Sequence, residues 1–414
     1  MNFEYGCIGE SLKHSFSKEI HNALADYKYE IIEIPRDALD KFAKEKSFKA
    51  INVTIPYKEM IIPYLDFIDD AAKEIGAVNT VVNKNGRLYG YNTDFYGMSE
   101  LISRVGIDLK DKKVIILGTG GTSKTAYAVA RSMNAGVILK VSRTGKEGSI
   151  TYSELYKSHS DADVIINTTP SGMYPNIFDA PVDLSHFGKL SGVIDAVYNP
   201  LRTPLIIEAK KRGIKAEGGL YMLVCQAVRA SEIFLDIKYE KDVTDRIFKD
   251  IYRKKENIVL IGMPASGKST VARILSKFLC RELIDTDDLI EKSENKSIPE
   301  IFAEYGEPYF RDAESREIKG IASLSGKIIA TGGGAILRSE NVDALRENGR
   351  IYFIDRPLAD LIPTSDRPLS SDKEAITKRY EERYEIYKDC ADVTVKVCGG
   401  AESVSDSITE DFFK

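Results

Sequence analysis

Two glycine-rich loops, each placed directly after a short apolar run, constrain this chain more than any other feature. The first lies in VIILGTGGTSKTA at 114–126, and the second lies in LIGMPASGKST at 260–270. A strand, a glycine-rich turn and a helix together form the unit that holds nucleotide phosphates in parallel α/β sheets. With 414 residues, the chain is too long for one hydrophobic core and predicts two or three domains. Each loop can therefore belong to a fold of its own.

Composition excludes several classes of protein. The chain is 43% hydrophobic and 29% charged with a net charge of −5, which is typical of globular proteins and predicts no nucleic-acid partner. No stretch approaches the roughly 18 apolar residues of a membrane span, and the N-terminus has no leader pattern, so we expect a cytoplasmic protein without membrane contact. The five cysteines have no CxxC spacing and are expected to be small buried apolar residues.

The order of apolar runs predicts the domains. Residues 3–94 alternate strand and helix patterns and include a hairpin with Asn85-Gly86 at its turn. From 114 onward, short β-rich runs alternate with helices, which predicts a parallel doubly wound sheet. A long helix is expected at 220–236 and should return to the first lobe. The charged segment 238–257 precedes a new IVLI strand and is the expected boundary. The predicted domains are 1–101 with returning helices 221–254, then 102–220, then 255–414.

The first loop fits a dinucleotide site in part. Gly118 and Gly120 match the first two glycines of the fingerprint, whereas Ser123 stands where a third small residue is usual. A plain turn between strand and helix is the alternative. Arg143 follows the second strand, where an NAD site would place an acidic residue for the ribose hydroxyl. An arginine there favours NADP over NAD, although it could also be a surface residue.

The first half resembles the shikimate dehydrogenases. It contains, in the family's order, GESLKHSFSKEIHN, NVTIPYKE, GAVNT, GYNTD, NTTPSGM, DAVYNPLRTPL and EGGLYMLVCQA, which span most of 5–227. The resemblance implies NADPH-dependent reduction of 3-dehydroshikimate to shikimate, with residues 1–101 as the shikimate-binding lobe and 102–220 as the NADP-binding Rossmann domain. It also implies roles for individual residues: a catalytic pair of Lys58 and Asp94; substrate contacts from Ser15, Ser17, Thr54, Asn79, Tyr198 and Gln226; and cofactor contacts from Gly118, Gly120, Gly121, Arg143, Thr168 and Gly219. Lys18 and the threonine-rich loop depart from the family pattern.

Residue types are compatible with these roles. Ketone reduction needs a proton for the forming alkoxide, and a lysine beside a carboxylate can deliver it. Hydroxyl and amide groups suit a small polar ring. Simpler interpretations stay open from the residues alone: Lys58 as a solvated lysine, Ser15 and Ser17 as helix caps, and Asn79 as a turn cap.

The second loop is more specific, because it follows an apolar strand and opens a helical stretch. Gly262 and Gly267 allow backbone N–H groups to face phosphates, Lys268 would reach the β- and γ-phosphates, and Ser269 would bind Mg²⁺. The loop therefore predicts ATP as a cofactor.

The second half resembles the shikimate kinases across 257–397, with LIDTDDLIE, EPYFRDAE, IIATGGGAIL, SDRPLS and RYEERYEIYKDCAD. The resemblance implies phosphorylation of shikimate and gives these roles: Asp287 for the substrate hydroxyls, Asp285 for magnesium, Arg311 and Arg383 for the substrate carboxylate, Gly332, Gly333 and Gly334 for close approach to the ring, and Arg367 in a closing lid. No histidine follows His186, so the base is expected to be a carboxylate, for which Asp287 is the choice. The basic residue that the family usually has before the lid is absent from LADLIPTSD.

The two halves would catalyse consecutive reactions, which predicts a bifunctional α/β enzyme: a two-lobed dehydrogenase with a Rossmann domain, followed by a P-loop domain. Two alternatives stay open. The first half could act on quinate, and the second half could be a nucleotide-sensing module without catalysis. A sensor would not need Asp287, Arg311 and Arg383 together. The sequence does not predict an oligomeric state.

Overall fold

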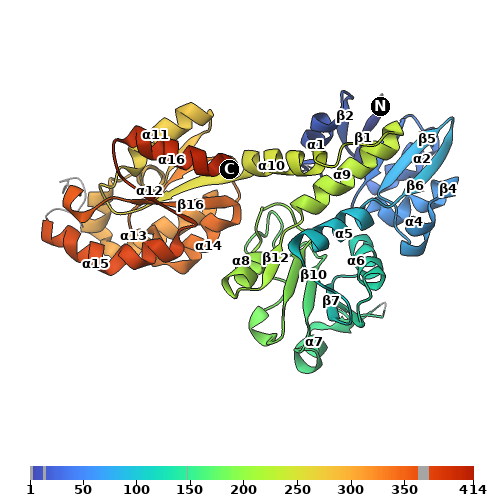
Figure 1. The fold of residues 1–414 in the computed structure, drawn as a ribbon, viewed down its shortest axis with the longest axis horizontal. Coiled ribbons are helices and arrows are strands. Elements are labelled where there is room, and N and C mark those ends of the chain that lie inside the picture. The colour runs from blue at the N-terminus through green and yellow to red at the C-terminus, as the bar shows by residue number, and fades with distance from the viewer. Residues whose placement is uncertain (1–2, 13–14, 147, 362–372) are drawn as a thin grey trace. The chain divides into compact units, whose positions relative to one another are not determined.

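The computed structural model describes residues 3–12, 15–146, 148–361 and 373–414, and the chain divides into two compact units, 1–251 and 252–414 (Figure 1). The division falls inside helix α10 (Val243–Lys255), within the charged segment that ends the first unit. Among the described residues, no helix is both long and apolar enough to cross a membrane.

The first unit begins with a mixed six-stranded sheet in the order β2-β1-β3-β5-β6-β4. Its strands are β1 (Tyr5–Gly9), β2 (Tyr29–Glu33), β3 (Ala50–Val53), β4 (Phe67–Ile68), β5 (Thr80–Lys84) and β6 (Arg87–Tyr91). Its helices are α1 (Ser17–Leu24), α2 (Leu39–Glu45), α3 (Tyr57–Met60) and α4 (Asp70–Ile75), with 3-10 turns η1 (Arg36–Ala38) and η2 (Ile62–Tyr64). The predicted hairpin is present as β5 and β6, with Asn85 and Gly86 both at positive φ in its turn.

Alternation along the strands decides which helices cover this sheet. Ile51 and Val53 of β3 pack in the cluster that contains α2 and α4 residues. Ala50, on the other face, packs with Phe234 of helix α9 (Leu220–Leu235). Because side chains of a strand alternate between faces, Asn52 also points toward the α9 side. The long helix thus returns to the first lobe as predicted.

The second sheet is parallel throughout, in the order β12-β11-β10-β7-β8-β9. Its strands are β7 (Lys113–Leu117), β8 (Val137–Ser142), β9 (Ile150–Thr151), β10 (Val164–Asn167), β11 (Gly192–Asp195) and β12 (Lys215–Glu217). The accompanying helices are α5 (Asp94–Val105), α6 (Gly121–Ser132), α7 (Tyr152–Ser158) and α8 (Pro204–Lys211), with η3 (Leu184–His186).

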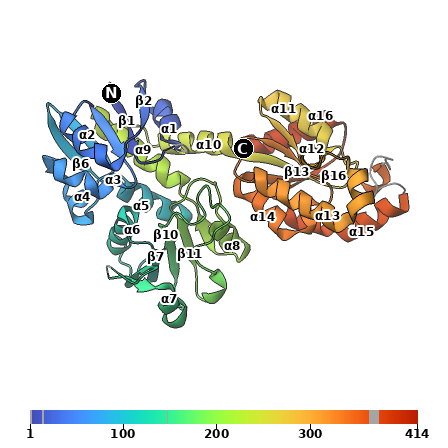
Figure 2. The same ribbon diagram turned by 180° about the vertical axis from the view of Figure 1, so that it is seen from behind.

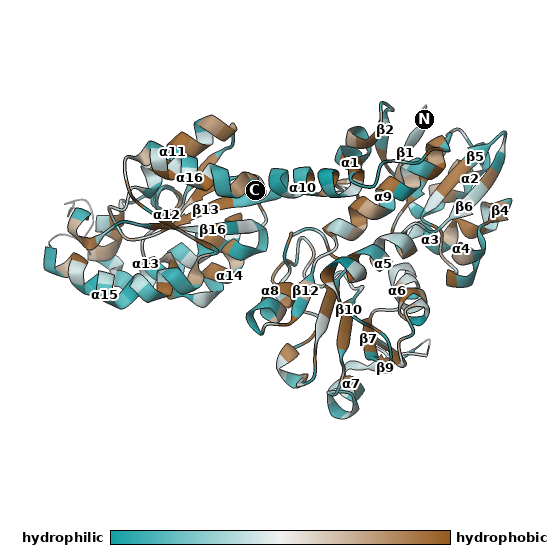
Figure 3. Cartoon of the chain, in the orientation of Figure 1, coloured by the Kyte–Doolittle hydropathy of each residue, from teal (hydrophilic) through white to brown (hydrophobic). Residues whose placement is uncertain are grey.

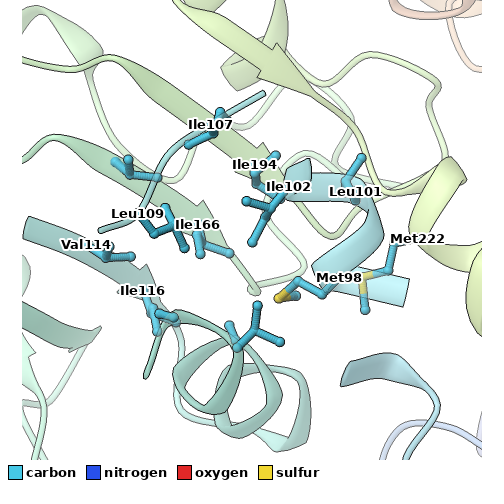
Figure 4. Packing of buried hydrophobic residues seen from close by; sticks show 14 of the residues in the cluster. Met98, Leu101, Ile102, Ile107, Leu109, Val114, Ile116, Ile166, Ile194 and Met222 are labelled. Carbon is cyan, nitrogen blue, oxygen red and sulfur yellow. The ribbon is translucent and has the colours of Figure 1, made fainter. Parts of the chain in front are cut away.

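Both faces of this sheet are buried, which explains why its strands read as continuous apolar runs. Val114 and Ile116 pack against α5, α6 and α9 (Figure 4). Ile115 and Leu117, which point the other way, pack against α7 and α8. In the buried strands β7, β10 and β11, polar residues therefore stand only at the strand ends, whereas the less buried β8 carries Lys140 in its interior.

The second unit is a parallel five-stranded sheet in the order β14-β15-β13-β16-β17. Its strands are β13 (Asn257–Ile261), β14 (Leu283–Asp285), β15 (Ile328–Ala330), β16 (Gly349–Asp355) and β17 (Val393–Lys396). Its helices are α11 (Lys268–Leu279), α12 (Thr286–Glu294), α13 (Ile298–Ile321), α14 (Ser339–Asn348), α15 (Lys373–Cys390) and α16 (Ala401–Phe413), with η4 (Ala335–Leu337) and η5 (Leu358–Asp360). Helices α11 and α16 cover one face, and α13, α14 and α15 lie on the other (Figure 2). Its strands are hydrophobic, whereas α15 is largely hydrophilic (Figure 3).

One sequence expectation was wrong in part. Cys280 and Cys398 are exposed, and only Cys7 and Cys225 are fully buried, because the first two lie at a helix end and in a loop after β17 rather than on a core-facing strand. The residue that caps α1 is Phe16, which gives no side-chain cap. The backbone N–H of Ser17 instead donates to the Ser15 hydroxyl at 3.3 Å.

A buried carboxyl group in α14 makes the stability of the second unit depend on pH. Glu347 is 2% exposed, and burial together with nearby Asp343 raises its pKa to about 9. The folded chain therefore keeps a proton that the unfolded chain releases between about pH 4.5 and 9, so this group destabilises the fold increasingly as pH rises through that window.

We predict that Glu347→Gln raises the unfolding temperature, and that the gain grows from pH 5 to pH 8. The amide has the shape of the protonated acid and carries no titration. Thermal unfolding at several pH values checks this, with exposed Glu340→Gln on the same helix as the control. A gain that is equal at all pH values would contradict it.

Candidate active sites

Lys58 and Asp94 form a buried ion pair in the first unit. Lys58 Nζ donates to Asp94 Oδ2 at 2.5 Å, and the side chains are 12% and 7% exposed. Lys58 lies in the short helix after β3, and Asp94 is the first residue of α5. The N-terminus of a helix interacts favourably with a carboxylate, so α5 and the Lys58 ammonium group both act on Asp94. The sequence-predicted catalytic pair is thus in direct contact.

A cluster of neutral polar side chains lies next to this pair. Asn79 Nδ2 donates to Thr93 Oγ1 at 3.0 Å and to Gln226 Oε1 at 3.4 Å, and Asn79 Oδ1 accepts from the Thr93 backbone N–H at 2.7 Å. Asn79 therefore does cap the turn before α5, and it also reaches Gln226 on α9. Because all three are buried, their mutual bonds fix where Asp94 begins its helix.

The remaining predicted substrate residues come from two places: Ser15, Ser17 and Thr54 belong to the first lobe, and Tyr198 follows β11 of the second sheet. Ser15 bonds Tyr198, and Tyr198 also packs on the ring of Phe16, with centroids 5.3 Å apart. Burial raises the pKa of Tyr198 to about 12, so it is a neutral hydroxyl. Ser17 is buried at the start of α1, and Thr54 is half-buried after β3. Of the predicted substrate set, the contacts connect Ser15 with Tyr198 and Asn79 with Gln226.

The first glycine loop joins β7 to α6 and reaches Lys58. Gly118 has φ +110, a conformation that side chains rarely adopt, and Thr168 Oγ1 lies 2.7 Å from where its Cβ would be. Gly121 lies against the Lys58 side chain, 3.4 Å from Lys58 Cβ to a Cβ built at Gly121. Ser123, the departure from the fingerprint, donates its hydroxyl to the Gly118 carbonyl at 2.6 Å. A serine is thus accommodated at this position because its hydroxyl bonds the backbone of the loop.

The other predicted cofactor residues differ in what surrounds them. Thr168 donates its hydroxyl to the Leu117 carbonyl at 2.6 Å, which fixes the loop. Arg143 is exposed after β8 and has no hydrogen bond or ion pair with the described residues. Gly219 caps α9, and a Cβ there would lie 2.3 Å from the Ala196 carbonyl. Position 219 therefore requires glycine because the backbone of Ala196 packs closely against it.

The second glycine loop joins β13 to α11. Gly267 has φ +95 at the helix start, and the Lys268 ammonium donates to the Gly262 and Met263 carbonyls at 2.9 and 3.0 Å. Ser269 Oγ donates to Asp285 Oδ2 at 3.0 Å. Asp285 ends β14, so the two oxygens predicted to serve magnesium lie together.

The predicted acceptor residues meet at the three glycines after β15. A Cβ at Gly332 would lie 2.5 Å from Asp287 Oδ1, and one at Gly334 would lie 2.0 Å from Arg311 Nη1. Arg383 Nη1 donates to the Gly333 carbonyl at 3.1 Å. Three side chains from α12, α13 and α15 thus surround one loop, and only glycine leaves room for them. Asp287, Arg311 and Arg383 thus lie at one loop, an arrangement that a nucleotide sensor without catalysis would not need. Arg367 lies outside the described residues.

Several residues of these sites were missed from the sequence. Glu314 is fully buried and accepts from Arg311 Nη1 at 2.7 Å, and burial raises its pKa against the opposing effect of Arg311. Its position three residues after Arg311 on a helix could have indicated it. The sequence could also have indicated Thr93, because it directly precedes Asp94. Asn52, which donates to the Asn79 carbonyl at 3.3 Å, gives no comparable local signal.

Two protein-family models match the chain. A model described as the shikimate dehydrogenase substrate-binding domain matches residues 7–81, within the first lobe. A model described as shikimate kinase matches residues 264–412, within the second unit.

Curated relatives and solved structures match more than half of the chain. A shikimate dehydrogenase (NADP(+)) of Clostridium beijerinckii is 38% identical over 261 residues, which cover 59% of this chain and 96% of the relative. The crystal structure of shikimate dehydrogenase 1 from Peptoclostridium difficile is similar with a TM-score of 0.57 and 37% identity, covering 61% of this chain and 98% of that chain. A Thermus thermophilus shikimate 5-dehydrogenase in complex with NADP(H) and shikimate is similar with a TM-score of 0.54 and 28% identity, covering 60% and 99%.

The glycines of the first unit give a matched pair of predictions. Gly120 has ordinary dihedral angles and no heavy atom within 4 Å of a built Cβ, so Gly120→Ala should leave the unfolding temperature unchanged while weakening dinucleotide binding. Gly219→Ala should instead destabilise the unit by about 1–3 kcal/mol, because the Ala196 carbonyl has to move. Thermal unfolding and a dinucleotide titration check both. Equal stability losses would show that Gly120 is needed for packing.

Proposed function

The chain belongs to the shikimate dehydrogenase family and carries a shikimate kinase domain after it, and from this premise we propose how its two sites divide the work. It is a bifunctional enzyme of the shikimate pathway. The first unit reduces 3-dehydroshikimate to shikimate with NADPH, and the second transfers a phosphoryl group from ATP to a shikimate hydroxyl.

In the first unit, Lys58 delivers the proton. NADPH supplies a hydride when bound, and the carbonyl oxygen that receives the substrate's new charge needs a proton at the same time. The buried pair supports this role, because Asp94 holds the Lys58 ammonium at 2.5 Å and the lysine side chain lies against Gly121 of the dinucleotide loop. In the reverse direction, Lys58 takes the proton back.

Neutral groups hold the substrate ring in this proposal. Ser15, Ser17 and Thr54 supply hydroxyls, and Asn79 and Gln226 supply amides, which suits a ring with several hydroxyl groups. Asn79 and Gln226 already bond one another, so the geometry of the pair is fixed before substrate enters. Such preorganisation lowers the entropic cost of orienting the ring.

The residues present fit a dinucleotide. Around Gly120 there is space within 4 Å where a side chain would project, and the N-terminus of α6 presents backbone N–H groups, as phosphates require. Gly118, Gly120, Gly121, Thr168 and Gly219 would hold it, and Arg143 would bind the 2′-phosphate that distinguishes NADP from NAD.

In the second unit, Asp287 orients the acceptor hydroxyl and takes its proton. ATP supplies the phosphoryl group when bound, and its phosphates would be held by the backbone from Gly262 to Gly267 and by Lys268. Arg311 and Arg383 hold the substrate carboxylate. The convergence of Asp287, Arg311 and Arg383 on Gly332–Gly334 is the single observation that carries the assignment of a kinase acceptor site rather than a nucleotide sensor.

Magnesium is also part of the proposal. Ser269 Oγ and Asp285 Oδ2 are 3.0 Å apart, and hydroxyl and carboxylate oxygens are the ligands that Mg²⁺ prefers. No cluster of three or more His, Cys, Asp or Glu side chains suited to a metal exists in the part of the chain that the structure describes. Magnesium would therefore take its other ligands from nucleotide phosphates and water, as in other phosphoryl-transfer sites.

One incubation tests the proposed function. The purified chain is supplied with 3-dehydroshikimate, NADPH, ATP and Mg²⁺, and the products are identified by mass spectrometry; shikimate 3-phosphate is expected. Accumulation of shikimate without its phosphate would contradict the kinase assignment. Parallel reactions with quinate and NADP⁺ compare the alternative substrate, and faster turnover of quinate than of shikimate would contradict the substrate assignment.

Two substitutions should each silence one activity and spare the other. We expect Lys58→Ala to lower dehydrogenase turnover by about 10²–10⁴-fold, because proton transfer is lost while cofactor binding is retained. Asp287→Asn should nearly abolish phosphorylation while ATP still binds. Each variant is the folding control of the other, since the unaffected activity reports an intact unit. Unchanged turnover in either would remove that residue from its proposed role.

Cofactor choice should depend on Arg143. A charge-assisted contact with phosphate contributes about 1.5–3 kcal/mol, so Arg143→Ala should raise the KM for NADPH by roughly 10- to 100-fold and leave that for NADH almost unchanged. Initial rates with both cofactors measure this. Equal losses with NADPH and NADH would show that Arg143 does not contact the 2′-phosphate.

A further inference from the structure

Arg311 makes more contacts than a role in binding the substrate carboxylate requires. Its Nε and Nη2 both donate to Glu307 Oε1, at 3.2 and 3.0 Å, and its Nη1 donates to Glu314 Oε2 at 2.7 Å. The two glutamates differ in their surroundings. Glu314 is fully buried, whereas the side chain of Glu307 is 45% exposed. Glu314 thus belongs to the framework of the site, and Glu307 lies at its border with solvent.

The Nε and Nη2 edge of a guanidinium is one of the faces that bind a carboxylate with two parallel hydrogen bonds. Glu307 occupies this edge of Arg311. The Nη1 side of the guanidinium is more confined, because Nη1 donates to the buried Glu314 and a Cβ built at Gly334 would lie 2.0–2.4 Å from Nη1, Cζ and Nη2. A carboxylate that binds Arg311 through its Nε and Nη2 edge therefore competes with Glu307 for the same two donors.

Two further arginines lie near this point. Arg383 lies across the glycine loop, and Arg379 lies one turn before it on α15, where its Nη1 donates to the Ala375 carbonyl at 3.3 Å. Burial and the charge of Arg383 lower the pKa of Arg379, and Glu307 acts in the opposite direction. A second carboxylate would therefore stabilise the charges of both neighbouring arginines, even while Glu307 remains nearby.

We propose that Glu307 is an internal competitor for Arg311, which substrate has to displace, and that it sets the affinity of the second unit for carboxylated substrates. Helix α13 permits this exchange, because Glu307 follows the kink at Gly306, where the backbone has φ +78. The inference rests on the proposed role of Arg311 in binding the shikimate carboxylate. With Glu307 present, the affinity of the second unit for shikimate is lower than the arginines alone would give.

Glu307→Gln tests the proposal through the KM for shikimate. The amide removes the charge and keeps the shape, so we expect the KM and the dissociation constant for shikimate to fall about two- to fivefold, in the range of one partly exposed ion pair. The kcat and the KM for ATP should not change. Glu307→Asp keeps the charge but shortens the side chain, and its KM should lie between the two.

Glu304→Gln is the matched control. Glu304 is on the same helix, its side chain is 52% exposed, and it pairs with Lys296 rather than with Arg311. It removes the same charge and should leave the KM for shikimate unchanged. An equal fall in KM for both variants would reveal a general charge effect and overturn the proposal.

The opposite result is equally informative. If Glu307→Gln raised the KM for shikimate or left it unchanged, Glu307 would position Arg311 or be irrelevant, and the competition would be refuted. Failure of the wild-type chain to phosphorylate shikimate would instead refute the proposed kinase function. The wild-type assay therefore separates the two failures.

Discussion

Parallel strands that are buried on both faces can place polar side chains only at their ends, and both sites of this chain depend on that constraint. In the first unit, β7, β8 and β10 end at the glycine loop, at Arg143 and at Thr168. In the second unit, β13, β14 and β15 end at the phosphate loop, at Asp285 and at Gly332. The carboxyl ends of neighbouring parallel strands lie at the same edge of the sheet, so residues that are far apart in sequence come together there.

Both sites also contain charges that are partly buried, and these lie on the helices next to the sheets. A buried charge is costly unless it is paired and hydrogen-bonded. Lys58 has Asp94, and Arg311 has Glu314. These pairs are weak evidence for stability, since apolar residues of the same volume often stabilise as well. Their retention is understandable when the charges act on a substrate, because a buried lysine or arginine is oriented in advance.

The two units meet the same recognition problem with different side chains. On the proposed assignments, the first holds the ring with hydroxyls and amides, and the charged pair among its proposed site residues is Lys58 with Asp94. The second adds the arginines of α13 and α15. The difference has a physical reason: transfer of a phosphoryl group brings several negative charges close to the substrate carboxylate, and cations are needed to offset their repulsion. Hydride transfer has no such requirement near the carboxylate.

The sequence by itself determined the nucleotide loops, the parallel sheets, the long helix 220–235 and most of the residue types of both sites. These features are local or periodic: a glycine loop follows its strand directly, and buried strands read as apolar runs. The sequence did not reveal that Asn79 bonds Gln226, that Gly121 lies against Lys58, or that Glu307 shares Arg311 with Glu314. It also misjudged the exposed Cys280 and Cys398. Only the tertiary structure decided these points, because each depends on which elements pack together, and neither spacing nor residue type records that for side chains 147 positions apart, as in the pair of Asn79 and Gln226.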